Sequence, residues 1–315
     1  MNQPFISICI PAYKNRDFLK RLLDSIAIQS FADFEVVISD DSPDETLLDL
    51  VNSFGKEIRI TYYRNHVPLG SPLNWNKSIS LAKGEWIKIM HDDDWFSNTN
   101  SLKLFADVAK TVKTDFIFSG YINVDLATGE KKEHIITIYD LKRISQNPLY
   151  LFRTNYIGHP STTLIRNTQR EWFDDRVKWV VDFEFYIRAL KQGSPPNAIR
   201  LPLISIGVSS EQITRQVFRN PSFEVPENIY LLKRLGEDSL ANIFVYDYYW
   251  RLIRNLEVRK LSDLSIHLPK DESVPDPVVR MILVQRIIPL FVLKIGVVSK
   301  IMMFFNWCIY MLKRK

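Results

Sequence analysis

Three consecutive aspartates, Asp92, Asp93 and Asp94, follow an apolar run at residues 86–90 that is typical of a buried strand. Adjacent carboxylates repel one another and weaken a fold unless a cation lies among them. Mg²⁺ and Mn²⁺ prefer carboxylate and phosphate oxygens and often take only one or two protein ligands. The triplet therefore indicates a divalent metal that carries a diphosphate. From these residues alone, a solvated acidic turn that caps the next helix is the alternative.

The elements around the triplet predict how it is positioned. Continuous apolar runs predict four buried strands, at residues 5–10, 34–38, 58–63 and 86–90. Amphipathic segments between them predict helices, so we expect an α/β fold with a mostly parallel sheet and helices on both faces.

Local signals predict where these strands and helices begin and end. We expect Pro11 to end the first strand and Asp17 to cap the first helix. A capping box of Ser42 and Glu45 would begin the second helix, and Ser71–Pro72 the third.

Polar or turn-forming segments follow three of these strands. They are Pro11–Ala12–Tyr13, Asp40–Asp41–Ser42 and the acidic triplet. Ligands bind such sheets at the carboxyl ends of the strands, where these distant segments would meet at one edge. This convergence is stronger evidence for a binding site than any of the three motifs alone.

Beyond residue 120 the pattern changes. A hairpin is predicted at 121–140 with its turn near 127–129, followed by a strand at 161–165, a helix at 180–190 and a strand at 198–206. From about residue 224 the pattern is helical to the end, so we expect a domain of residues 1–223 and a helical C-terminal region of residues 224–315.

Composition limits the class of protein. The chain has 315 residues, 46% hydrophobic and 24% charged, as expected for a globular protein. A net charge of +5 is too small to favour nucleic acid as a partner. Cys9 and Cys308 lack metal-ligand spacing, and residues 1–4 lack a signal-peptide pattern, so we expect a reducing, cytoplasmic location.

Together, the motifs resemble those of glycosyltransferase family 2, whose members have the GT-A fold. The family has a strand-Pro-x-Tyr opening, an Asp-Asp turn, an Asn-containing helix, an Ala-x-Gly-Glu approach to a DxD motif, and an acidic pair that includes the base. The matching segments are residues 8–13, 34–42, Asn76 with 82–87, 92–94 and 181–184. They occur in the family's order across roughly residues 5–206.

Three features depart from the family pattern. The first acid of its Asp-x-Asp-Asp string falls on His91, and the glycine expected after Asp41 is missing. Some relatives have a late histidine that helps to bind the metal, but this chain has none between His159 and His267.

The resemblance implies roles for individual residues. Asp41 would accept the N3–H of a uracil or thymine ring, and Asp93 and Asp94 would hold Mn²⁺ or Mg²⁺. Asp182 would be the catalytic base, with a helix N-cap as the alternative. Glu184 is expected to pair with Arg188 as a structural contact. The remaining donor-binding residues would be Pro11, Ala12, Tyr13, Asn76 and Asp92.

The resemblance also divides the first domain by function. Residues 1–120 would be its nucleotide-binding half and residues 121–223 its acceptor-binding half. The loop of residues 207–223 would close over the donor, with Arg215 and Arg219 near the diphosphate; a plain exposed loop is the alternative.

From residue 281 the chain is strongly apolar, with Arg286, Lys294 and Lys300 on one side of a helical wheel and basic residues at 313–315. This pattern predicts helices that lie in a membrane interface, which would make the protein peripheral at the inner face of the cytoplasmic membrane. Helices that pack on the catalytic domain or on a partner subunit are the alternative.

We therefore expect a metal-dependent, inverting glycosyltransferase. It would transfer a sugar from a UDP- or dTDP-sugar to a saccharide acceptor, a lipid-linked intermediate of a surface glycan. One alternative is a sugar-nucleotide nucleotidyltransferase, which would need a glycine-rich loop that residues 11–15 do not provide. Another is a non-catalytic nucleotide-sugar-binding subunit, which the presence of both Asp93 and Asp182 disfavours.

Overall fold

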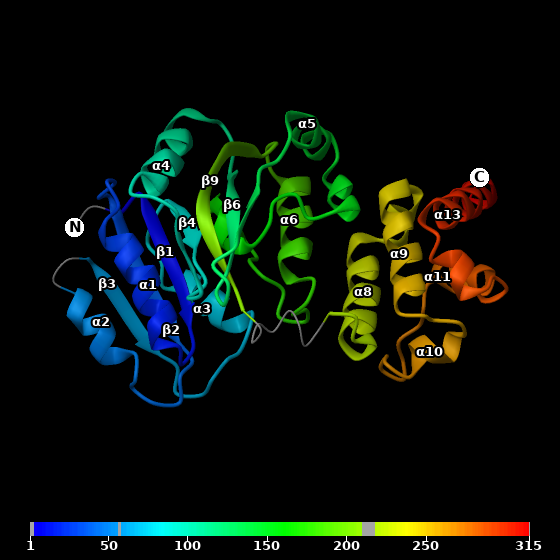
Figure 1. Ribbon diagram of the computed structural model, residues 1–315, viewed down its shortest axis with the longest axis horizontal. Coiled ribbons are helices and arrows are strands. Elements are labelled where there is room, and N and C mark those ends of the chain that lie inside the picture. The colour runs from blue at the N-terminus through cyan, green and yellow to red at the C-terminus, as the bar shows by residue number, and fades with distance from the viewer. Residues whose placement is uncertain (1–2, 56–57, 210–217, 315) are drawn as a thin grey trace. The chain divides into compact units, whose positions relative to one another are not determined.

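The computed structural model describes residues 3–55, 58–209 and 218–314. The chain divides into two compact units: Met1–Pro148 with Tyr156–Ser210, and Leu149–Asn155 with Glu211–Lys315 (Figure 1). Residues 149–155 belong with the C-terminal helices because the rings of Tyr150 and Phe152 pack edge-on against Phe244 and Tyr248. The C-terminal region predicted from the sequence, residues 224–315, does not include this segment.

The first unit is built on one mixed sheet, which has nine strands within the described residues. Their order is β3-β2-β1-β4-β8-β6-β9-β5, with β7 beside β6. Four neighbouring strands are mutually parallel: β1 (Ile6–Ala12), β2 (Phe34–Asp40), β3 (Ile60–Arg64) and β4 (Trp86–Ile89). The others are β5 (Asp94–Phe96), β6 (Phe116–Asp125), β7 (Lys131–His134), β8 (Thr163–Arg166) and β9 (Asn197–Val208).

Helices connect these strands. In the first unit they are α1 (Arg16–Ala27), α2 (Leu48–Phe54), α3 (Leu73–Ser80), α4 (Ser101–Thr111), α5 (Ile138–Gln146), α6 (Val181–Gln192) and the short η2 (Pro160–Thr162). The second unit is helical in its described residues. Its elements are η1 (Pro148–Arg153), α8 (Pro221–Leu235), η3 (Glu237–Ala241), α9 (Ile243–Asn255), α10 (Leu261–Ser265), α11 (Asp276–Arg286), α12 (Leu290–Leu293) and α13 (Gly296–Lys313).

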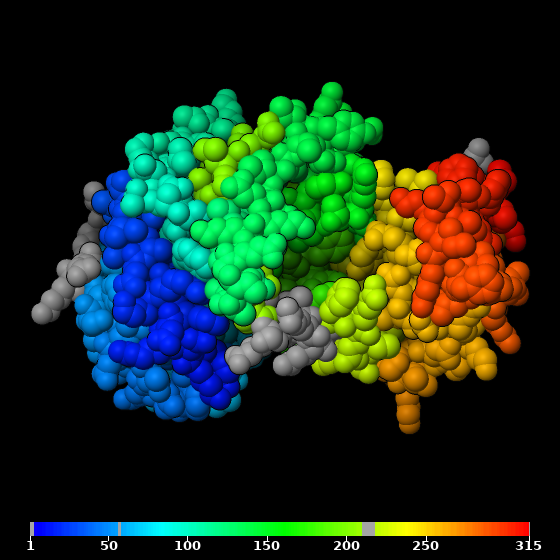
Figure 2. All heavy atoms as spheres, in the orientation of Figure 1, coloured from blue at the N-terminus to red at the C-terminus, as the bar shows by residue number. Residues whose placement is uncertain are grey.

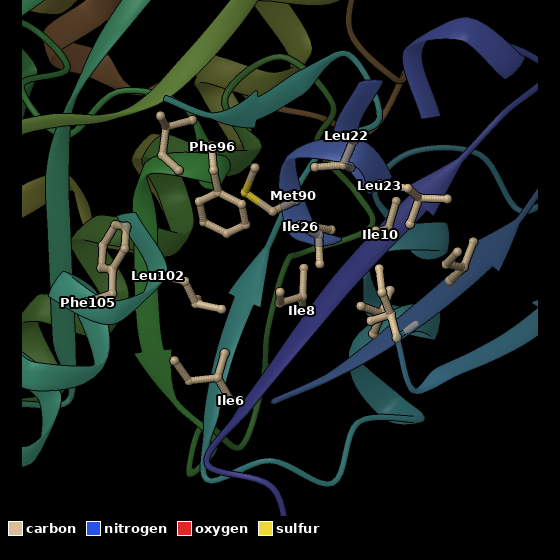
Figure 3. Close-up of a cluster of buried hydrophobic side chains, with 14 of the residues drawn as sticks. Ile6, Ile8, Ile10, Leu22, Leu23, Ile26, Met90, Phe96, Leu102 and Phe105 are labelled. Carbon is tan, nitrogen blue, oxygen red and sulfur yellow. The ribbon is translucent and has the colours of Figure 1, made fainter. Parts of the chain in front are cut away.

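The core of the first unit lies between β1 and the helices that cover it. Alternate residues Ile6, Ile8 and Ile10 extend from β1 among the side chains of α1, which include Leu22, Leu23 and Ile26 (Figure 3). All six are fully buried, and each contributes roughly 1.5–3 kcal/mol to stability. A strand anchored in this way holds the loop at its carboxyl end in a fixed place.

Two predicted element ends are wrong near the start of the chain. β1 continues through Pro11, which pairs with Ser39 of β2. Pairing with β4 stops at Cys9, so the missing N–H of Pro11 leaves no gap on that side. Asn15 caps α1 through a 3.0 Å bond from the Phe18 N–H, and Asp17 lies in the first turn.

Two further helix starts differ from expectation. α2 begins at Leu48 without a side-chain cap, because the Ser42 hydroxyl is already bonded to the Lys14 N–H at 2.8 Å. α3 begins at Leu73, and its N-cap position is Pro72 rather than Ser71.

Candidate active site

The loops after β1, β2 and β4 meet at the carboxyl edge of the sheet. The Asp41 N–H donates to the Ala12 carbonyl at 3.0 Å, and the Tyr13 N–H donates to Asp92 Oδ2 at 3.2 Å. Together with the bond between Lys14 and Ser42, these contacts join all three segments directly. The predicted convergence of the motifs is confirmed.

Asp41 is buried and held by the loop that follows β3. Its carboxylate accepts from Asn65 Nδ2 at 2.7 Å, the Leu69 N–H at 3.0 Å and the Gly70 N–H at 2.7 Å. A carboxylate has about four lone-pair sites, so these bonds leave one for a further donor. Asn65 also donates to Asn74 Oδ1 at 3.0 Å, which fixes the position of the amide.

Asp40, by contrast, is bonded within its own neighbourhood. It accepts from the Ser42 N–H at 2.8 Å and from the Tyr62 hydroxyl at 2.6 Å, and its side chain is fully buried. These contacts shape the turn that presents Asp41.

A group of side chains with metal-ligand chemistry follows β4. His91, Asp93 and Asp94 each offer a ligand atom, and these atoms lie within 4.8 Å of one another. His91 Nε2 is buried and has no hydrogen-bond partner within the described part of the chain. The imidazole ring packs against Trp75, with centroids 4.5 Å apart. His91, which departs from the family pattern in sequence, therefore lies inside the cluster.

The electrostatics of this cluster favour a bound cation. Burial, then the charge of Asp93, raises the pKa of Asp92 to about 7 and that of Asp94 well above its usual value. Burial lowers the pKa of His91, so the imidazole is neutral, which is the form that binds metals. Two carboxylates and a neutral imidazole with an unpartnered nitrogen fit a divalent ion such as Mn²⁺ or Mg²⁺.

A buried lysine supports the cluster from inside the sheet. Lys88 lies on β4 with no exposed surface, and its ammonium donates to the Ser161 carbonyl. The Ser161 hydroxyl accepts a hydrogen bond from the backbone N–H of His91 at 3.0 Å and also hydrogen bonds to the Asp94 carboxylate. Burial lowers the pKa of Lys88 to about 7, and the charge of Asp94 opposes this shift. Lys88 thus holds the residue that orients two members of the cluster.

Asp182 lies in the first turn of α6. Val180 occupies the N-cap position, so the N-cap alternative for Asp182 is wrong. Burial, then the charge of Asp182, raises the pKa values of Tyr121 and Tyr186, which places this carboxylate near both rings. Glu184 forms the expected buried pair with Arg188, at 2.8 Å.

Tyr121 and His159 link Asp182 to the cluster. The Tyr121 ring stacks on His134 with centroids 4.8 Å apart and meets His159 edge-on at 5.9 Å. Burial lowers the pKa of His159, and the charge of Asp93 opposes that shift. Asp182 and the cluster after β4 therefore belong to the same region of the first unit.

The other predicted donor-binding residues differ in their contacts. Pro11 and Ala12 are buried at the end of β1, whereas the side chain of Tyr13 is 51% exposed, with Lys14 Nζ 4.8 Å from its ring centroid. Both ends of the Asn76 amide are bonded to the Phe173 backbone, at 2.7 and 3.1 Å. Asn76, which lies on α3, thus anchors the segment around Phe173, 97 residues later in the chain.

The two arginines predicted to meet the diphosphate belong to the second unit. Arg215 lies outside the described residues. Arg219 is described, and its backbone N–H donates to Glu224 Oε1 at 2.6 Å. Its contact with a donor stays a prediction.

The fold is that of an α/β protein whose candidate binding groups follow parallel strands at their carboxyl ends, the edge at which such sheets bind ligands. The family model described as glycosyl transferase family 2 matches residues 7–173, more than half of the chain. The chain therefore belongs to glycosyl transferase family 2.

Curated relatives carry related names. The putative colanic acid biosynthesis glycosyl transferase WcaA of Escherichia coli (strain K12) is 28% identical over 200 residues, which are 62% of this chain and 69% of the relative. The UDP-Glc:alpha-D-GlcNAc-diphosphoundecaprenol beta-1,3-glucosyltransferase WfaP of Escherichia coli is 26% identical over 132 residues. That match spans 42% of this chain and about half of the relative's length, 49%.

Solved structures share the fold. TarS of S. aureus in complex with UDP-GlcNAc has a TM-score of 0.57 at 18% identity, over 80% of this chain and 81% of that one. The mannosyltransferase PcManGT of Pyrobaculum calidifontis, in complex with GDP-Man and Mn²⁺, has a TM-score of 0.54 at 13% identity, over 100% and 89%. These likenesses show the GT-A fold that the sequence predicts.

The helices of the described residues are short or polar relative to what a bilayer requires. None of them combines the length and the apolar character that a membrane-spanning helix requires.

Proposed function

We propose that this transferase moves a sugar from a UDP- or dTDP-sugar to a hydroxyl group of a lipid-linked saccharide, with inversion at the anomeric carbon. The observation that carries the proposal is the edge at which Asp41, Tyr13 and the cluster of His91, Asp93 and Asp94 are joined. The solved relative TarS binds UDP-GlcNAc, and the name of WfaP specifies a UDP-glucose donor with a diphosphoundecaprenol acceptor, which supports both substrate classes.

Each side chain at the edge has a role in this proposal. Asp41 uses its remaining lone pair to accept the N3–H of the base, and the exposed ring of Tyr13 stacks on the nucleoside. Asp92 fixes the Tyr13 backbone through its 3.2 Å bond. Pro11 and Ala12 form the floor of this pocket. Asn76 holds Phe173, whose ring packs against Trp75 beside His91.

Asp93 and Asp94 hold the divalent ion, and we add His91 to the predicted ligands because of its unpartnered Nε2. When bound, Mn²⁺ or Mg²⁺ supplies positive charge that stabilises the leaving nucleoside diphosphate. PcManGT, a solved relative with the same fold, binds Mn²⁺, which supports this cofactor class.

Asp182 acts as the general base. It takes the proton from the acceptor hydroxyl while that oxygen attacks the anomeric carbon from the face opposite the diphosphate. The new bond between the acceptor oxygen and the anomeric carbon forms as the bond to the diphosphate oxygen breaks, so the configuration is inverted.

The acceptor of this proposal is attached to a membrane lipid. A catalytic chain without a described spanning helix then needs another means of reaching the bilayer, and the basic, apolar helices near the C-terminus are suited to that task. We propose that the protein acts at the inner face of the cytoplasmic membrane as a peripheral protein.

The test combines binding and turnover. A panel of nucleotide sugars is titrated calorimetrically with Mn²⁺, and the donor that binds is then assayed for hydrolysis and transfer. We expect Asp182→Asn to bind donor and Mn²⁺ like the natural chain and to lose at least about 100-fold in turnover. Asp93→Asn should lose the Mn²⁺-dependent part of donor binding.

Asp107→Asn is the matched control, since this exposed carboxylate forms an ion pair with Lys103 on α4. Unchanged turnover in Asp182→Asn would refute the role of the base. Donor binding without turnover in the natural chain would support the binding subunit, and pyrophosphate release from a nucleoside triphosphate and a sugar phosphate would support the nucleotidyltransferase.

A further inference from the structure

The second unit carries an extended apolar surface on its last helices, which we call the tail surface. Its exposed side chains include Ile287 at 82%, Phe291 at 72% and Phe305 at 63%. The surface consists of Ile287, Phe291, Ile295, Val297, Ile301, Phe304, Phe305, Ile309 and Leu312. Exposed apolar side chains that are concentrated in one segment of a chain indicate an interaction site. Figure 2 shows the atoms of α11 to α13, in orange to red, on the surface of the molecule.

The helix α13 has two distinct faces. Ser299, Met303 and Asn306 are buried, and Ser299 Oγ accepts from Trp250 Nε1 of α9 at 3.1 Å. The exposed residues 297, 301, 305 and 309 are spaced four apart and so form one stripe on the other side. The buried face packs within the second unit itself. The stripe stays exposed to solvent and could contact a different partner.

The charge of this segment identifies that partner. Residues 277–315 contain seven lysines and arginines and no aspartate or glutamate. Carboxylates from elsewhere in the unit pair with two of them: Glu257 with Lys294 at 2.8 Å and Asp238 with Arg314 at 2.6 Å. An apolar stripe accompanied by an excess of positive charge complements an anionic lipid surface.

A basic pocket adjoins the tail surface. It has a volume of about 350 Å³ and is lined by Arg219, Arg254, Asn255, Glu257 and Lys294. Its link to the tail surface is Lys294, which lies between the exposed Phe291 and Ile295 in the chain, whereas Arg254 donates to Ser299 Oγ on the buried face of α13 at 3.2 Å. Burial lowers the pKa of Arg254. The charge of Arg251 lowers it further, Asp247 opposes this shift, and Arg219 makes a smaller contribution in the same direction as Arg251, so Arg254 is repelled by both neighbouring guanidinium groups. A phosphate group would relieve that repulsion.

We propose that the tail surface binds an anionic phospholipid membrane, with its apolar side chains in the interface and a lipid phosphate in the basic pocket. This inference deepens the proposed function, because a lipid-linked acceptor is found at such a surface. Free phosphate and the diphosphate of the acceptor share the chemistry of the headgroup, so the experiment must separate them.

The first arm measures binding of the full chain to vesicles by sedimentation, without any sugar donor. We expect binding to vesicles of phosphatidylcholine with about a third phosphatidylglycerol, weak binding to phosphatidylcholine alone, and loss of binding at high salt. The double substitution Ile301→Ser and Phe305→Ser should weaken binding at least about tenfold. The control is Ile266→Ser, which changes a residue that is 75% exposed in the same unit but outside the tail surface.

The second arm tests the pocket. Lys294→Gln and Arg254→Gln should each weaken binding to the anionic vesicles about fivefold and leave binding to phosphatidylcholine unchanged. Lys270→Gln, an exposed lysine outside residues 277–315, is the control. Thermal unfolding of each variant shows whether a loss is due to misfolding, and Lys294 is the safer site because its side chain is exposed.

Three results would overturn the inference. One is tight calorimetric binding of inorganic pyrophosphate that leaves vesicle binding unaffected, which assigns the pocket to a soluble anion. The second is a dimer in solution that Ile301→Ser with Phe305→Ser converts to a monomer, which assigns the surface to a second copy. The third is equal binding of the tail variants and the controls. Transfer activity measured on a soluble acceptor distinguishes these results from failure of the proposed function.

Discussion

Gly207 tests whether the cluster after β4 is a metal site that depends on exact positions. This residue of β9 is buried, and a Cβ added to it would lie 2.6 Å from the Asp93 carbonyl oxygen and 3.3 Å from Arg21 Nη2. The Gly207 N–H also bonds to the Asp94 carboxylate. Gly207→Ala therefore acts on two predicted metal ligands without removing either.

The size of the effect follows from these distances. Ordinary contact begins at 3.4 Å, so the Asp93 carbonyl and the new methyl group must separate by about 0.8 Å. Overpacking of this kind costs roughly 1–3 kcal/mol of folding stability. Metal–ligand distances tolerate changes of only about 0.2 Å, and displaced supporting contacts typically weaken metal affinity by about 10–100-fold. We expect Gly207→Ala to lower Mn²⁺ affinity by that factor.

The matched control is Gly84→Ala, just before β4 at the opposite edge of the sheet. Its added Cβ would lie 2.5 Å from the Ser7 backbone nitrogen, so the cost in stability should be similar. The assay is calorimetric titration of Mn²⁺ in the presence of UDP, with urea denaturation for stability. The reasoning fails if Gly207→Ala binds Mn²⁺ normally, or if Gly84→Ala loses affinity to the same extent.

Three further outcomes are expected. Because the pKa of Asp92 is raised, the folded chain holds an extra proton between about pH 4 and pH 7, and the stability of the metal-free protein should fall as pH rises through this window. Mn²⁺ affinity should rise with pH until about pH 7, because the carboxylate must lose this proton. An affinity that is flat from about pH 5.5 to 8 would contradict this. Glu184→Gln removes the close carboxylate partner of Arg188, which keeps Glu171 at 4.0 Å, and should cost about 1–3 kcal/mol in urea denaturation. Mn²⁺ affinity should stay intact, and a loss of affinity would argue against a purely structural pair. Asn65→Ala removes one of three bonds to Asp41 and should weaken UDP binding about tenfold, whereas Asn52→Ala on α2 should not.

The parallel part of the sheet could be predicted because its signals are local. Each of the first four strands is a continuous apolar run, and the observed ends lie within two residues of the predicted ones. The edge followed from a general rule about parallel strands, so Asp41 and the acidic triplet could be brought together without side-chain detail.

Features that depend on contacts between distant segments could not be predicted. β5 has only three residues and exists because it pairs with β9, more than 100 positions away. A buried lysine such as Lys88 is unfavourable in a strand unless its ammonium has an acceptor. That acceptor is the Ser161 carbonyl, 73 residues later in the chain. Asn65 directly follows β3, so the rule that identified the other segments could also have identified this residue.

The charges around the triplet favour the binding of a further cation. Two cations of the described chain, Arg21 and Lys88, act on these carboxylates. Arg21 Nη2 donates to the Asp93 carbonyl at 2.8 Å, and the charges of Arg21 and Lys88 interact with Asp94. Two positive charges do not balance three carboxylates, which is consistent with the raised pKa values of Asp92 and Asp94. A nucleoside diphosphate adds further negative charge to the same edge. Arg21 and Lys88 already donate to the backbone carbonyls of Asp93 and Ser161, so in the proposed function a metal ion that binds with the donor would supply the missing positive charge.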